Sequence, residues 1–212
     1  PQTWRSMRLV STYYNRLLGW HAYVDKFTVV ASDFEARTWC LDGKFHREHD
    51  LPAVIYTDGG RSWHRYGLLH RDHDRPALIC SSGSHVWCQH GENHRNHDRP
   101  AHINSTGSRA WYQHDQIHRD HDKPAALRWD GTITWCQHNQ THRDYDRPAY
   151  IDPDGDRAWY QHDQIHRDHD RPARVDACGR RSWYQYSMLH RDHGRPFIIH
   201  VNGSTSNPVM SR

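Results

Sequence analysis

Apolar residues recur along this chain with a fixed step of 24 residues between positions 39 and 203. Each step contains one tryptophan, one proline, and one aliphatic residue four places before a glycine, and no insertion or deletion interrupts the register. The tryptophans are Trp39, Trp63, Trp87, Trp111, Trp135, Trp159 and Trp183. The glycines are Gly59, Gly83, Gly107, Gly131, Gly155, Gly179 and Gly203. We therefore interpret residues 39–203 as seven tandem units.

Within a unit, apolar and polar residues alternate instead of following the period of about 3.6 that is typical of a helix. In the unit that begins at Trp159, Pro172 and two turn sites leave no stretch of roughly ten residues in which a helix would form. The pattern predicts an all-β fold built from hairpins.

The segment 151–155, Ile-Asp-Pro-Asp-Gly, indicates the type of hairpin. Pro153 suits the first central position of a type I turn, and Gly155 suits the left-handed residue of a bulge, which gives a three-residue loop. This loop sets Ala149 opposite Trp159 and puts both on one face with the aliphatic residue of the unit. A two-residue loop would put tryptophan and aliphatic residue on opposite faces and leave the proline in a strand.

A second chain reversal is expected four residues after each tryptophan, because most residues there tolerate a positive φ. These residues are Gly43, Gly67, Gly91, Asp115, Asn139, Asp163 and Ser187. A single hairpin is marginal in water, so neighbouring units must stack to complete a core. We predict an elongated twisted ribbon of about 67 Å if each unit adds two strands, or a coiled solenoid of about half that length.

The two ends of the chain depart from the period. In residues 1–38, apolar side chains at helical spacing between Arg5 and Leu18 predict a helix, and Phe27–Ala31 is typical of a strand. This segment is expected to cap the array, or else to present a helix to a partner. Residues 204–212 are expected to form a polar tail.

Composition agrees with a thin, repeated core. Leu, Ile, Val and Phe are only about 15% of 212 residues, whereas 10 Trp and 11 Tyr supply apolar area, and the net charge is +3. No apolar run is long enough to span a membrane, and the first residues lack the apolar region of a signal peptide. The missing initiator Met suggests a processed or truncated chain, and five Cys indicate a reducing compartment.

Histidines are the main candidates for catalysis or metal binding. His-Arg-Asp recurs in five units, but a protein kinase has one such loop together with motifs that this chain lacks, so we expect no catalytic residues and no cofactor. Candidate metal ligands at His-x-x-His spacing are His70, His73, His118, His121, His166 and His169. The alternative, favoured by repetition in every unit, is that these segments tie down a loop through turn amides and Arg–Asp pairs between neighbouring units.

Two further features bear on binding. Cys40, Cys88 and Cys136 follow the tryptophan in alternate units, too far apart for disulfides, and are expected to be half-buried substitutes for tyrosine. Charges are balanced within each unit and no basic stripe emerges, so we expect no nucleic-acid partner. The 22 His predict that stability or assembly depends on acidification.

The pattern Trp-Tyr-x-x-Gly-x-x-His-Arg, followed by Pro-Ala-x-Ile and Asp-Gly, resembles the MORN-like repeats of large DNA viruses of amoebae and of some bacterial antitoxin-like proteins. The resemblance covers residues 39–203 and implies β-hairpin units in an elongated sheet with a scaffold, membrane-proximal or virion role. This chain departs from it by one extra residue in the loop before the proline and by having three Lys.

On this basis we expect a non-enzymatic structural protein of a large assembly, such as a minor capsid or internal scaffold protein of a virus particle. Its partners would be other protein subunits or further copies of itself, and its location the virion, or otherwise the cytoplasm. Peripheral contact with a membrane stays open. The alternatives are a soluble, antitoxin-like protein-binding module and a His-rich metal-binding array.

Overall fold

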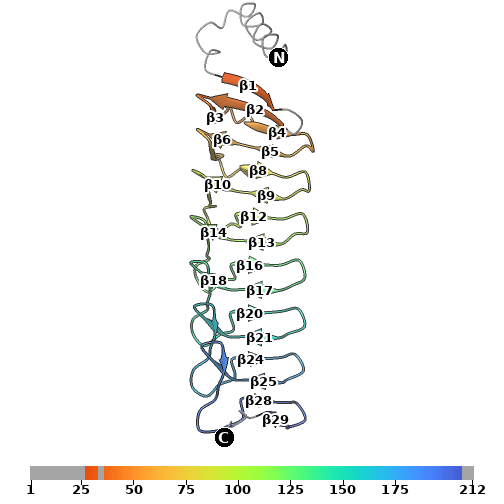
Figure 1. The fold of residues 1–212 in the computed structure, drawn as a ribbon, viewed down its shortest axis with the longest axis vertical. Helices are drawn as coiled ribbons and strands as arrows, with labels where there is room; N and C mark the ends of the chain where they lie inside the picture. The colour runs from red at the N-terminus through yellow and green to blue at the C-terminus, as the bar shows by residue number, and fades with distance from the viewer. Residues whose placement is uncertain (1–26, 33–35, 207–212) are drawn as a thin grey trace, which may run out of the picture.

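The computed structural model describes residues 27–32 and 36–206, which form an elongated stack of short antiparallel strands (Figure 1). Within these ranges the chain contains strands and turns and no helix, as the alternating pattern predicted. Strand β1 (Phe27–Ser32) confirms the strand expected at Phe27–Ala31. The helix expected between Arg5 and Leu18, and most of the tail expected at 204–212, lie outside the described residues.

One antiparallel sheet of 17 strands runs the length of the stack. β2 pairs with β1, β3 and β4, and from β4 onward each strand pairs with the next strand of this sheet in chain order. Its strands after β1 are β2 (Ala36–Leu41), β3 (Lys44–Phe45), β4 (Val54–Tyr56), β5 (Arg61–Ser62), β8 (Leu78–Ile79), β9 (His85–Val86), β12 (His102–Ile103), β13 (Arg109–Ala110), β16 (Ala126–Leu127), β17 (Ile133–Thr134), β20 (Tyr150–Ile151), β21 (Arg157–Ala158), β24 (Arg174–Val175), β25 (Arg181–Ser182), β28 (Ile198–Ile199) and β29 (Thr205–Ser206). Each unit adds two strands, as the ribbon alternative assumed.

A column of small two-stranded hairpins stacks beside this sheet (Figure 1). The hairpins pair β6 (His64–Arg65) with β7 (Leu68–Leu69), β10 (Cys88–Gln89) with β11 (Glu92–Asn93), β14 (Tyr112–Gln113) with β15 (Gln116–Ile117), β18 (Cys136–Gln137) with β19 (Gln140–Thr141), β22 (Tyr160–Gln161) with β23 (Gln164–Ile165), and β26 (Tyr184–Gln185) with β27 (Met188–Leu189). The repeating unit therefore has four short strands, two more than the sequence pattern predicted.

The loop between the two large-sheet strands of a unit is the three-residue bulged loop that the sequence predicted. Ile151 pairs with Arg157, so residues 152 and 156 form the closing pair and residues 153–155 form the loop. The Gly155 amide donates to the Asp152 carbonyl at 3.1 Å, and Gly155 has a φ of 98°. A residue with a Cβ would be strained at this φ, which explains the glycine in every unit.

Two further turns use left-handed residues. In the small hairpin, His162 and Asp163 have φ of 50° and 65°, which is the pattern of a two-residue type I′ turn. The sequence predicted a positive φ only at the second of these positions. His169 and Asp170, with φ of 62° and 51°, turn the chain back toward the large sheet, and this turn was not predicted.

Each tryptophan lies where the chain passes from the large sheet into a small hairpin. The Trp159 amide donates to the Ala173 carbonyl, just before the next large-sheet strand, at 2.8 Å, whereas its carbonyl accepts from the His166 amide at 3.1 Å. One extended segment thus pairs with the next strand of the large sheet in its first half and with the returning strand of its small hairpin in its second half.

The core lies on the side of the strands that carries the tryptophans, which we call the Trp face. The repeat tryptophans from Trp63 to Trp183, at the 24-residue step, are at most 9% exposed. The alanines beside them have no exposed surface: Ala53, Ala77, Ala101, Ala125, Ala149 and Ala173. Small alanines pack beside large indoles, so the core is one residue thick and contains few aliphatic residues. In the seventh unit the equivalent position is Phe197, whose carbonyl accepts from the Trp183 amide at 2.8 Å.

Candidate functional site

The segment from the histidine seven places after each tryptophan to the next proline, for example 166–172, forms a return loop over the Trp face. The arginine of this loop contacts a carboxylate, a backbone carbonyl and an indole ring, and Arg71 is an example. The guanidinium bonds both carboxylate oxygens of Asp50 in the preceding unit, at 2.7 and 3.0 Å, and donates to the Pro76 carbonyl at 3.2 Å. Its Cζ lies 3.6 Å from the ring centre of Trp63, whose Nε1 donates to the Asp50 carbonyl at 3.0 Å. We call this arrangement the clasp.

The clasp recurs with nearly constant geometry. Arginine stacks on tryptophan at 3.6–3.9 Å in all seven units. The receiving carboxylates are Asp50, Asp74, Asp98, Asp122, Asp146 and Asp170, and each also binds a second cation from the following unit. Bonds to these cations lower the pKa of Asp98 and Asp170 to about 2. In the seventh unit the equivalent position is Gly194, which offers no carboxylate.

Histidines at the start of the return loops form a second link between units. Buried His70 donates from Nε2 to Asp72 at 3.0 Å, and its Nδ1 accepts from the His90 amide of the next unit at 3.1 Å. The His70 and His90 rings lie 4.6 Å apart between centres. Because a backbone amide can only donate, Nδ1 carries the lone pair and Nε2 carries the proton. Both nitrogens of such a histidine are therefore occupied.

These hydrogen bonds agree with the interpretation in which the His-x-x-His segments tie down a loop. His70, His118 and His166 face carboxylates and turn amides, whereas the second histidine of each pair lies at an exposed loop tip. These second histidines are His73, His121 and His169. Among the residues that the structure describes, no group of three or more His, Cys, Asp or Glu side chains is placed to hold a metal ion.

Shallow cavities open between successive return loops. One of about 300 Å³ is lined by Arg119, Lys123, Arg143, Asp144 and neighbouring side chains. The charged groups on its walls are largely members of clasps, so they are already paired with one another.

The cysteines after the tryptophans are more buried than predicted. Cys40, Cys88 and Cys136 are buried free thiols, and burial raises the pKa of Cys88 and Cys136 to about 11. Cys178, at the tip of a large-sheet loop, is exposed. The expectation that these thiols do not form disulfides agrees with the structure.

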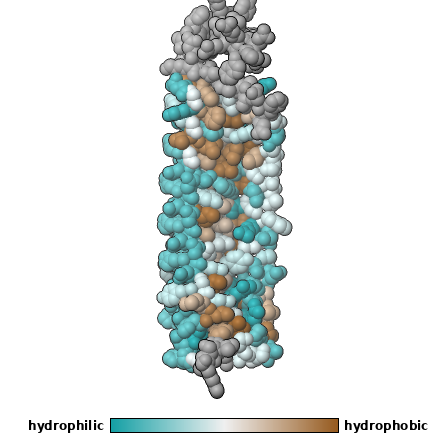
Figure 2. Space-filling model, viewed as in Figure 1, coloured by the Kyte–Doolittle hydropathy of each residue, from teal (hydrophilic) through white to brown (hydrophobic). Residues whose placement is uncertain are grey.

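The opposite side of the strands, which we call the open face, carries an apolar stripe that runs along the stack (Figure 2). It is lined by the residue after each tryptophan and the residue after each buried alanine. These are Cys40, His64, Cys88, Tyr112, Cys136, Tyr160 and Tyr184, and Val54, Leu78, His102, Ala126, Tyr150, Arg174 and Ile198. Most are half-buried, and none from this set is fully exposed.

A column of arginines on the Trp face was also missed. Arg61, Arg109, Arg157 and Arg181 stand two places before a tryptophan, on large-sheet strands, and all four are exposed. In the part of the chain that the structure describes, none of them makes an ion pair, unlike the return-loop arginines. The same position holds His85 and Ile133 in two intervening units, so the four arginines form an interrupted column and not a continuous basic stripe. Positive and negative charges balance when they are summed along the chain within one unit. The sheet, however, places the same position of different units side by side, so arginines from separate units lie in one column.

Within the described residues, no helix is long and apolar enough to cross a membrane. No family model matches this chain, and no curated protein matches it in sequence.

Proposed function

We propose that this chain is a non-enzymatic structural protein, an elongated scaffold that holds other protein subunits along its open face. The observation that carries the proposal is the row of apolar patches along that face (Figure 2), which is interrupted at His64, His102 and Arg174. Exposed apolar patches gathered on one face of a protein are typical of a protein interface.

The units are linked tightly enough for the stack to act as one body. Besides the clasp and the histidine link, the Asp163 amide of one small hairpin donates to the Thr141 carbonyl of the hairpin before it at 3.0 Å. The same bond recurs between the other small hairpins. Because every junction repeats the same bonds, the units keep a constant pitch of about 9.6 Å, two strand spacings.

The open face has the size and chemistry of a stable interface. Five residues of strand across seven units give an area of about 1,100 Å², against about 800 Å² per partner in a typical complex. Half-buried tyrosines such as Tyr112 and Tyr160 combine contact area with a hydroxyl group, which suits interface cores. The charged Arg174 on this face is neutralised by Asp156 and Asp176, at 2.9 and 2.8 Å.

The setting we propose, a particle of a large DNA virus with this chain as minor capsid or internal scaffold protein, rests on the resemblance to MORN-like repeats. Quantitative proteomics of purified particles tests it, and we expect a stoichiometric component. A discrete one-to-one complex with a soluble partner, measured by mass photometry, would instead support the antitoxin-like binding module.

The role of the open face is tested by substitution within the same particles. Tyr112→Glu combined with Tyr160→Glu places charge in the stripe without touching a clasp, so the array should fold but no longer be incorporated. The matched control is Gln116→Glu with Gln164→Glu, in the partner strands of the same hairpins, at a position where Glu92 stands in another unit. Equal incorporation of both variants would contradict the proposal.

A further inference from the structure

The arginine column of the Trp face has no acidic partner within the described chain. Arg157 pairs across the sheet with Ile151 on one side and Val175 on the other, so its neighbours offer only half-buried aliphatic side chains. Arg61, Arg109 and Arg181 have the same surroundings. From Arg61 to Arg181 the column covers about 48 Å along the stack, or ten strand spacings.

The same face carries carboxylates that no arginine or lysine of the described chain neutralises. They are Asp120, Asp144, Asp168 and Asp192, one per unit on the return loops, with 55–62% of each side chain exposed. Each accepts from a histidine Nε2 of its own unit at 2.9–3.0 Å. Asp120, Asp144 and Asp168 also accept from a glutamine at 3.3 Å, which places them over the small hairpins.

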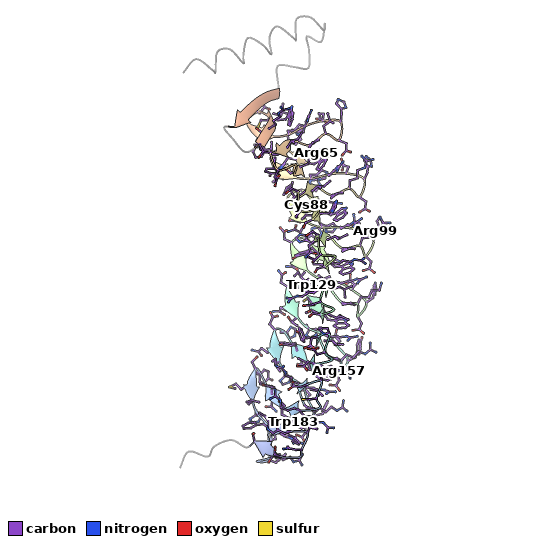
Figure 3. All side chains as sticks on the ribbon, turned by 90° about the vertical axis from the view of Figure 1, so that its right-hand side faces the viewer. Arg65, Cys88, Arg99, Trp129, Arg157 and Trp183 are labelled. Atoms are coloured by element: carbon purple, nitrogen blue, oxygen red, sulfur yellow. The ribbon has the colours of Figure 1, made fainter. Side chains whose placement is uncertain are left out.

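The two columns lie at different heights. Return loops project from the Trp face as a ridge, with Arg99 far from the strands, while Arg157 stays closer to the sheet (Figure 3). A flat surface would meet the ridge before it reached the arginine column. A partner must therefore be narrow and elongated, and its negative charges must repeat at the same spacing as the units of the array.

We propose that this partner is a second copy of the chain, packed Trp face to Trp face and parallel, so that the return-loop ridge of each copy lies along the arginine column of the other. The ridge carries carboxylates that no arginine or lysine of the described chain neutralises. Because two identical arrays have identical pitch, the pairs Arg109–Asp120, Arg157–Asp168 and Arg181–Asp192, each 11 residues apart in the sequence, form together in one register.

Symmetry selects the parallel arrangement. A two-fold axis along the rod sets the large-sheet half of one Trp face against the small-hairpin half of the other, which brings arginine to carboxylate on both sides. A two-fold axis across the rod sets large sheet against large sheet, and arginine then meets arginine. This dimer uses the face opposite the apolar stripe, so it stands or falls independently of the proposed function.

Sedimentation velocity on the full chain tests the pairing. We expect a dimer at low salt that dissociates at high salt, because exposed ion pairs are screened. The quadruple variant R61Q/R109Q/R157Q/R181Q should raise the dimer dissociation constant by about tenfold or more. The variant R61K/R109K/R157K/R181K, which keeps the charge, should remain dimeric.

The carboxylate side has a conservative test of its own. Asn96 occupies the equivalent position in another unit and accepts from His94 Nε2 at 2.9 Å, so D120N/D144N/D168N/D192N should fold normally. We expect it to be monomeric with an unchanged melting temperature. The open-face variant with Tyr112→Glu and Tyr160→Glu should stay dimeric, which separates failure of this inference from failure of the proposed function.

Orientation is measured with spin labels at the loop tips of the first and seventh hairpins, on Thr57→Cys or Asn202→Cys with Cys80→Ser and Cys178→Ser. A parallel dimer gives similar distances at both sites and at Trp129→Cys in the fourth hairpin. An antiparallel dimer gives a minimum at the fourth hairpin and about 58 Å along the rod at either end. Antiparallel distances, a wild-type monomer at all salt concentrations, or arginine-dependent binding to duplex DNA or anionic vesicles by a monomer would overturn the inference.

Discussion

Removal of one clasp arginine should weaken the array far more than removal of its neighbour on the same carboxylate. In the fourth junction, Arg143 bonds Asp122 at 2.6 and 3.1 Å, donates to the Pro148 carbonyl at 3.1 Å and stacks on Trp135 at 3.8 Å. Arg147 binds the same Asp122. The exposed fractions of the two arginine side chains are 14% and 55%.

The magnitudes follow from these contacts. Arg143→Ala removes two charge-assisted bonds, one bond to a carbonyl and a partly desolvated cation–π contact, while Asp122 keeps Arg147 as a partner. We expect a loss of about 3 kcal/mol in the free energy of unfolding. Arg147→Ala removes one exposed ion pair and should cost about 0–1 kcal/mol. Arg143→Lys keeps the charge but not the planar fork, so it should recover less than half of the loss.

Urea denaturation followed by circular dichroism and tryptophan fluorescence measures these differences, because Trp135 lies under the substituted side chain. Hydrogen exchange shows which part of the array is weakened. Amides of the units flanking residue 143 should lose protection first, since each unit contacts only its neighbours. If Arg143→Ala proved no more destabilising than Arg147→Ala, the clasp would not be the main link between units.

Further outcomes are expected for the pH dependence of stability, for metal content and for thiol reactivity. Burial lowers the pKa of His64 and His102, so the folded chain binds fewer protons than the unfolded chain, and the melting temperature should fall as the pH drops below about 6.5; superimposable melting curves at about pH 5 and 7.5 would contradict this. Lowered pKa values of about 2 for Asp98 and Asp170 add a second loss as the pH falls from 3.8 toward 2. Elemental analysis of the purified chain should find less than about one metal equivalent, because the buried histidines have both ring nitrogens engaged. A maleimide reagent should modify exposed Cys178 rapidly and leave Cys88 unmodified until the chain unfolds.

Much of the unit could be predicted from local chemistry. The step between tryptophans, the glycine of the bulged loop and the pairing of Ile151 with Arg157 all follow from residues within one hairpin. The left-handed pair at His169 and Asp170 did not follow from one hairpin alone, since the bond that Arg191 donates to the Asp170 side chain comes from the next unit.

The candidate site was harder to predict for the same reason. Trp159 donates to the carbonyl of Asp146, 13 residues earlier, and Arg167 bonds the side chain of Asp146, 21 residues earlier. Neither separation equals the period, so the period alone does not place the return loop over the tryptophan. Which face is covered and which is open is decided by these contacts between units.

Because every clasp links a carboxylate to the arginine of the following unit, an internal unit can be removed or added without leaving any clasp residue unpaired. Deletion of residues 135–158 would join Thr134 to Trp159, and Asp122 would then receive Arg167 in place of Arg143. Duplication of an internal unit is equally neutral, whereas a unit added after the seventh would find Gly194 where its arginine needs a carboxylate. The length of the stack is therefore set by the number of internal units, and each unit that is added or removed changes it by about 9.6 Å.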